Sequence, residues 1–250
     1  MHVAAHIRDL ILTGHLVPGQ KLRLVPLAEA LKVSTTPIRE ALLLLEAEGL
    51  VRSEARRGFR VKAISREDIR DLFELHAFIA GKLAERATLK LTQGQLRDLL
   101  NHSEQIKKSA TEGNGELVEQ LNFEFHRIIN RAAESPILAR FLAATTRYVP
   151  RHFYAQIAGW MEASATEHDP ILDALQRGDP AAARTLTEEH IRRAGVLLVD
   201  YLETKSFWTS HGGPVSHHPP LLLLTDGHDS TSFAARSATG QHRLDLPVKD

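Results

Sequence analysis

Two short apolar stripes with helical spacing lie almost end to end near the start of the chain. The first consists of Leu24, Leu27, Ala28 and Leu31, and the second of Ile38, Ala41, Leu42 and Leu45. Ser34 suits a helix N-cap, and Pro37 is tolerated in a first helical turn. The pattern therefore predicts two helices joined by a tight turn, with the second helix over about residues 35–48.

The neighbouring segments complete a small domain. Before the turn, Val3, Ile7, Leu10 and Ile11 have the spacing of one helix face, which ends at Thr13 and Gly14. After it, two strand-like pieces at 50–53 and 59–61 flank a basic loop, which predicts a β-hairpin. Three short helices followed by a hairpin are typical of a winged helix-turn-helix, which we assign to residues 1–64.

The charge of this segment favours a nucleic-acid partner. The formal net charge of the whole chain is zero, but residues 1–64 carry ten Lys and Arg against six Asp and Glu. The start of the predicted second helix of the motif would enter a major groove, and the loop of the hairpin would reach an adjacent groove. The candidate DNA-contacting residues are Ser34, Thr35, Thr36, Arg39, Arg56, Arg57 and Gly58.

The same segment resembles a known family. The stretches IRDLILTGHLVPGQKL, LAEALKVSTTPIREALLLLEAEGLV and RRGFRV are similar to the winged helix of GntR-family bacterial transcription regulators. The resemblance covers almost all of residues 3–62 and implies binding to a double-stranded DNA operator. Thr35 stands where the family usually has an Arg that helps to read the operator. Because one small winged helix makes few base contacts, we expect a homodimer on an inverted repeat.

The rest of the chain is different in kind. From Ser65, which can cap a helix with Asp68, helical spacing continues to about residue 204 without a convincing strand. Breaks near 92–94, 112–115, 135–136, 150, 169–170 and 178–180 divide it into about six helices. We therefore predict a mainly α protein, with an all-α antiparallel bundle over 65–205. Clustered Gly, Pro, Ser, Thr and His predict a disordered tail over 206–250.

Polar residues interrupt three apolar stripes of this bundle. Asn122 and His126 share a stripe with Phe125 and Ile129, while His168 and His190 lie on stripes of two further helices. Burying an unpaired imidazole is costly, so each ring needs a partner. A lone histidine on such a face is more often a satisfied core residue, but three on three helices favour a shared site.

This region resembles the FCD ligand-binding domain of FadR-type regulators, over roughly 66–203. The resemblance is carried by LNFEFHRIINRA and EHDPILDALQRGDPAAARTLTEEHIRRA. It implies a divalent metal, with zinc expected and nickel or manganese as alternatives, held by Asn122, His126, His168 and His190 and completed by a carboxylate effector. Asn122 stands where Asp is common, and His76 stands where Arg is frequent. His76 is therefore assigned to effector binding.

Other classes of protein are excluded or disfavoured. The absence of cysteine excludes disulfides, thiolate metal sites and cysteine nucleophiles. The start MHVAAHIRDL lacks the apolar run of a secretory signal and no stretch is long enough to span a membrane, so we expect a cytoplasmic protein without a membrane partner. Two alternatives remain: an architectural DNA-binding dimer without effector, and a metal-dependent hydrolase-like enzyme. The second is disfavoured because Glu167 and Glu189 adjoin the predicted ligands in sequence and should point away from them.

Overall fold

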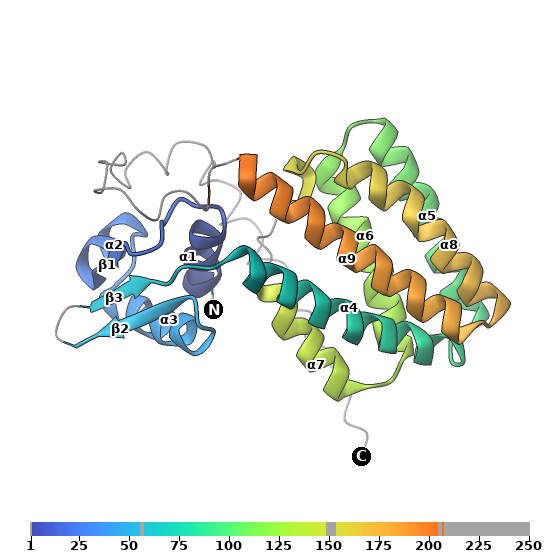
Figure 1. Ribbon diagram of the computed structural model, residues 1–250, viewed down its shortest axis with the longest axis horizontal. Coiled ribbons are helices and arrows are strands. Elements are labelled where there is room, and N and C mark those ends of the chain that lie inside the picture. The colour runs from blue at the N-terminus through green and yellow to red at the C-terminus, as the bar shows by residue number, and fades with distance from the viewer. Residues whose placement is uncertain (1, 56–57, 149–153, 205–206, 208–250) are drawn as a thin grey trace, which may run out of the picture. The chain divides into compact units, whose positions relative to one another are not determined.

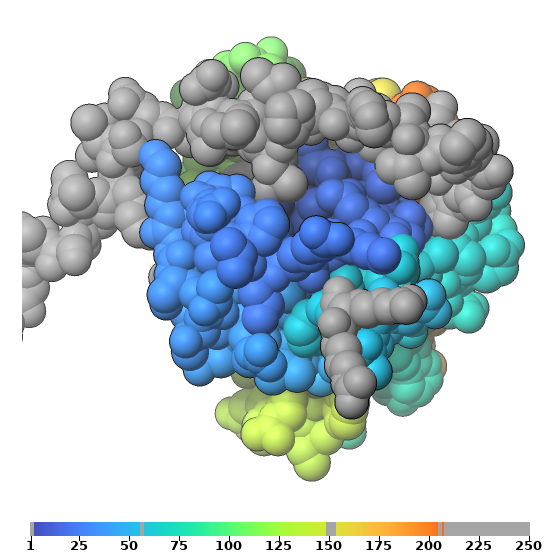
Figure 2. All heavy atoms as spheres, turned by 90° about the vertical axis from the view of Figure 1, so that its left-hand side faces the viewer, coloured from blue at the N-terminus to red at the C-terminus, as the bar shows by residue number. Residues whose placement is uncertain are grey.

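The computed structural model describes residues 2–55, 58–148, 154–204 and 207. The described residues of the first part form α1 (His2–Leu12), β1 (Lys21–Leu22), α2 (Leu24–Ala30), α3 (Thr35–Ala47), β2 (Val51–Glu54) and β3 (Gly58–Val61) (Figure 1). The strands form one antiparallel sheet in the order β1-β3-β2, in which Phe59 pairs with both Leu22 and Ser53. In Figure 2 the described residues of this part, coloured blue, form a closely packed body.

The predicted helix-turn-helix is confirmed as α2 and α3. The buried positions of their stripes are Leu27 and Ala28 in α2 and Ile38, Ala41, Leu42 and Leu45 in α3. Lys32 adopts a positive φ of 53° in the turn, where the N–H of Val33 donates to the carbonyl of Ala28 at 3.0 Å. The hairpin is confirmed as β2 and β3. Sequence analysis did not predict β1, which has only two residues.

The second part contains helices and no strand among its described residues. It consists of α4 (Arg66–Thr88), α5 (Gln93–Thr111), α6 (Gly115–Ala132), α7 (Pro136–Thr145), two short 3-10 helices η1 (Thr146–Tyr148) and η2 (Tyr154–Gln156), α8 (Trp160–Arg177) and α9 (Pro180–Thr204). The Ser65 hydroxyl accepts from the N–H of Asp68, and the Asp68 carboxylate accepts from the N–H of Ser65, as a capping box. None of the described helices is long and apolar enough to cross a membrane.

The breaks predicted near 150 and at 169–170 are not confirmed by the described residues. The break near 150 lies at 149–153, outside the described residues. The break at 169–170 is wrong, because Pro170 lies inside α8. The side chains of the next two residues, Ile171 and Leu172, are 0% and 4% exposed. Their burial offsets the hydrogen bond that the proline cannot donate.

Helices α4 and α9 pack side by side along much of their length (Figure 1). Gly195 permits the close approach, because a Cβ there would lie 2.6 Å from Cγ of Phe73. This packing brings the faces of α4 and α9 that carry His76 and His190 together. Of the expected tail, Phe207 is buried against the helical core, and 206 and 208–250 lie outside the described residues.

Candidate metal centre and candidate nucleic-acid interface

The start of α3 presents polar side chains to solvent. Ser34 is the N-cap residue, but its hydroxyl makes no capping hydrogen bond. Thr35, Thr36 and Arg39 are all exposed. Among the described residues Arg39 forms no ion pair, whereas Arg60 is held by both carboxylate oxygens of Glu54 at 2.6 and 3.1 Å. The guanidinium of Arg39 and the hydroxyls beside it are therefore available to a ligand at the helix N-terminus.

The hairpin loop gives a different result. Arg56 and Arg57 lie outside the described residues. Gly58 has a φ of 92°, and a Cβ at this position would lie 2.9 Å from the carbonyl oxygen of Leu22 in β1. A glycine is therefore required at 58 by the fold of the sheet itself, whether or not DNA approaches it.

The three predicted histidines come together from three helices. His126 on α6, His168 on α8 and His190 on α9 have ligand nitrogens that all lie within 4.8 Å of one another. Nε2 of His126 and Nε2 of His190 are 3.2 Å apart. Two nitrogens on a tetrahedral zinc ion with bonds of 2.0–2.1 Å are separated by roughly 3.3 Å, so the observed distance suits shared coordination.

Buried polar atoms at this cluster lack partners among the described residues. Both ring nitrogens of His168 and Oδ1 of Asn122 are buried without a hydrogen bond. His168 is 0% exposed and stacks on the ring of Phe125 with centroids 4.2 Å apart. Asn122 lies one turn before His126 on α6. Unsatisfied buried polar groups cost about 1–3 kcal/mol each, and a bound cation would remove that cost. The donor set fits a divalent metal.

The electrostatics favour the neutral form of the rings, which is the form that binds metal. Burial lowers the pKa of His126 and His168 well below the ordinary value, and the charge of His190 lowers both further. Burial also lowers the pKa of His76 to about 4, with a smaller contribution from His190. His76 stacks on Phe73 at a centroid distance of 6.1 Å. The predicted ligands His126 and His168 are thus neutral near pH 7, as ligation requires, and His76 is neutral as well.

Sequence reasoning missed the role of Glu167. The expectation that Glu167 points away from the predicted ligands is wrong for His190, because the Glu167 side chain reaches across to α9. Nδ1 of His190 donates to Oε2 of Glu167 at 2.8 Å, and Nε of Arg193 lies 2.9 Å from Oε1. The spacing within α8 shows that Glu167 leaves its own stripe, but it does not show which neighbouring helix the side chain meets.

Comparisons with known proteins agree with this architecture. Residues 1–61 match the profile of bacterial regulatory proteins of the gntR family, and residues 71–193 match that of the FCD domain. The chain is 28% identical to a probable D-xylose utilization operon transcriptional repressor of Paenarthrobacter nicotinovorans, over 76% of this chain and 85% of that protein. It is 27% identical to the HTH-type transcriptional regulator LutR of Bacillus subtilis strain 168, over 78% of this chain and 98% of LutR.

Solved structures share the fold. The structure of McbR/YncC from E. coli superposes with a TM-score of 0.62 at 22% identity, covering 80% of this chain and 96% of that one. The Lar protein that controls the agr system of Listeria monocytogenes gives a TM-score of 0.55 at 19% identity, over 79% and 94% of the two chains. The two relatives are named as a transcriptional repressor and a transcriptional regulator, and the solved structures show that the fold is shared.

Proposed function

Because the chain belongs to the GntR family of bacterial transcription regulators and carries an FCD domain, we propose that a small carboxylate effector, bound at a divalent metal, controls its affinity for an operator. Residues 1–64 would bind DNA, and residues 65–205 would bind the effector and dimerise. The observation that carries the proposal is the meeting of three largely buried imidazoles from three helices.

The metal would be held by His126, His168 and His190, with the amide oxygen of Asn122 as a fourth ligand. Zinc suits this nitrogen-rich set, and nickel or manganese are alternatives. The ion would supply a positive charge that attracts a carboxylate, and water or the effector would fill the remaining positions. His76, on α4 near His190, would contact the effector.

The DNA side of the proposal rests on the start of α3. Ser34, Thr35, Thr36 and Arg39 would enter the major groove of each half of an inverted repeat, with Arg56, Arg57 and Gly58 at the adjacent groove. A twofold dimer is supported by an exposed apolar face on α4 and α7, formed by Leu75, Phe78, Ile137 and Phe141, which are 49–69% exposed. A second copy of the chain would cover this face.

The test is operator binding measured by fluorescence anisotropy, with DNA sites selected from a random pool. Arg39→Ala should weaken specific binding by ~1–3 kcal/mol, about 5- to 150-fold, if Arg39 reads a base edge. The control is Arg97→Ala, which removes an exposed arginine from α5. Equal affinity of Arg39→Ala and the wild type would refute the assignment of Arg39.

Control of operator affinity by the effector is tested by a separate measurement. Operator affinity of the zinc-loaded protein should change on addition of citrate or benzoate as probe carboxylates, and the change should disappear after treatment with a chelator. A metal-loaded protein whose operator affinity ignores a panel of such acids would instead fit an architectural dimer. Hydrolysis of model esters that depends on the ion would favour the enzyme alternative.

A further inference from the structure

We propose that Glu167 is a positioning residue of the metal centre, which orients His190 for ligation and supplies negative charge that the ligand set lacks. The inference rests on the proposed metal binding. It concerns a residue that lies outside the predicted ligand set and on a different helix from the histidine it contacts.

The hydrogen bond fixes the tautomer of His190. An ionised carboxylate can only accept, so the contact of 2.8 Å between Oε2 and Nδ1 places the proton on Nδ1. In the neutral ring, Nε2 then carries the lone pair. That nitrogen is the one that lies 3.2 Å from Nε2 of His126. Glu167 therefore turns the binding atom of His190 toward the cluster.

Glu167 is itself held in place. Its second oxygen, Oε1, lies 2.9 Å from Nε of Arg193 on α9, and its side chain is only 19% exposed. Arg193 lies three residues after His190, so both partners of the carboxylate project from the same stretch of α9. The contact with Arg193 is an ion pair without a hydrogen bond, and the Arg193 side chain is 68% exposed, so the hydrogen bond to His190 is the contact that orients the imidazole.

Charge gives a second reason for this arrangement. Three imidazoles and an amide are all neutral ligands, so a divalent ion bound by them would keep its full charge in a largely buried place. The carboxylate of Glu167 is one hydrogen bond away from a ligand. It raises the electron density on His190 and compensates part of the charge. Losing such a partner typically weakens metal binding 10- to 100-fold.

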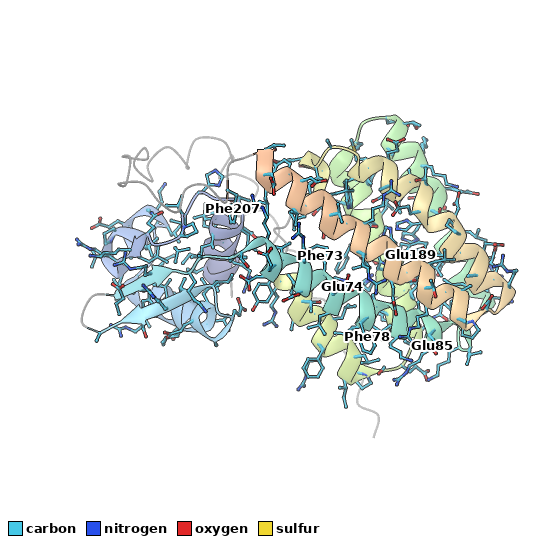
Figure 3. All side chains as sticks on the ribbon, viewed as in Figure 1. Phe73, Glu74, Phe78, Glu85, Glu189 and Phe207 are labelled. Atoms are coloured by element: carbon cyan, nitrogen blue, oxygen red, sulfur yellow. The ribbon has the colours of Figure 1, made fainter. Side chains whose placement is uncertain are left out.

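The experiment compares Glu167→Gln with Glu189→Gln. Both remove one carboxylate of α8 or α9 next to a predicted ligand in sequence, but Glu189 is exposed (Figure 3). Zinc affinity is measured by competition with a chromophoric chelator, and ligand geometry by the absorption of bound cobalt. We expect Glu167→Gln to bind zinc 10- to 100-fold more weakly, with the melting temperature of the metal-free protein little changed. Glu189→Gln should bind like the wild type.

A measurement on the metal-free protein separates orientation from charge. Nitrogen-15 NMR of labelled histidine reports which ring nitrogen carries the proton. His190 should be protonated on Nδ1 in the wild type and in Glu167→Gln, because the amide oxygen still accepts. It should lose that preference in Glu167→Ala.

The outcomes are distinguishable. If the wild type binds zinc and both Glu167 variants bind it equally well, the inference is overturned while the proposed metal function stands. If the wild type itself binds no divalent ion, the metal function fails and the inference fails with it. The NMR measurement then still shows whether Glu167 sets the tautomer of His190.

Discussion

Replacing Gly195 by alanine should destabilise the helical part of the protein, although alanine is the better helix former. Gly195 lies in α9, where α9 crosses Phe73 of α4 (Figure 3 labels Phe73). A Cβ at 195 would lie 2.6 Å from Cγ and 2.7 Å from Cβ of Phe73. These atoms lie close to the backbone of α4 rather than at the end of a flexible side chain, so the helices themselves would have to move apart.

The magnitude follows from two opposed effects. Overpacking of a core costs typically ~1–3 kcal/mol. The change from glycine to alanine in a helix returns about 1 kcal/mol. Phe73 is only 3% exposed and would be contacted at Cβ and Cγ, so the cost should fall in the upper half of its range. The net loss is then about 1–2 kcal/mol, or a melting temperature lower by about 2–8 °C.

The assay is thermal and urea unfolding followed by circular dichroism. Gly94→Ala in the first turn of α5 is the matched control, because the nearest atom to a Cβ there is Oγ1 of Thr92 at 3.8 Å. This control should unfold at the same temperature as the wild type or slightly above it. A Gly195→Ala protein with an unchanged or raised melting temperature would refute the reasoning from close packing.

Three further changes test other parts of the structure. Asn122→Asp should tighten zinc binding by about tenfold or more, because it adds a negative charge beside the ion; equal affinity in a chelator competition would count against Asn122 as a ligand. Phe78→Asp should shift the protein from dimer to monomer in analytical ultracentrifugation without loss of helical signal, and a persistent dimer would place the interface elsewhere. Ser65→Ala should lower the free energy of unfolding by ~1 kcal/mol through loss of the cap on α4. Hydrogen bonds from Ser65 lower the pKa of Asp68 below its ordinary value of 3.8. The stabilisation by the Asp68 carboxylate is therefore fully present when the pH is above 3.8, and it is lost as the pH falls through the lowered pKa.

Most helices and turns could be predicted from the sequence, because a helical stripe or a turn residue is recognised from a few neighbouring positions. Of the two exceptions, β1 had no local signal and Pro170 gave a misleading one. β1 has two residues, too few for any alternation, and exists because Lys21 and Leu22 pair with β3. Pro170 suggests a break because it cannot donate a hydrogen bond, yet tertiary packing of the residues beside it keeps α8 continuous.

The candidate site too could be predicted only in part from the sequence. Periodicity shows which face of a helix is buried, so the stripes of His126, His168 and His190 were visible in sequence. It does not show which helices are neighbours. The contact of Glu167 with His190 depends on how α8 and α9 are rotated against each other, and that information lies in tertiary packing.

The hairpin of α8 and α9 carries most of the candidate centre. It turns at Gly178, which has a φ of 66°, and Glu167 and His190 are separated by 23 positions, whereas His126 and His190 are separated by 64. Closing the longer loop costs roughly 0.9 kcal/mol more chain entropy, since the cost grows with the logarithm of loop length. An ion bound by His126 on α6 and by the histidines of the α8–α9 hairpin would link two segments that are far apart in the chain. Its binding would stabilise the position of α6 most, because holding α6 against the hairpin costs more chain entropy than closing the hairpin.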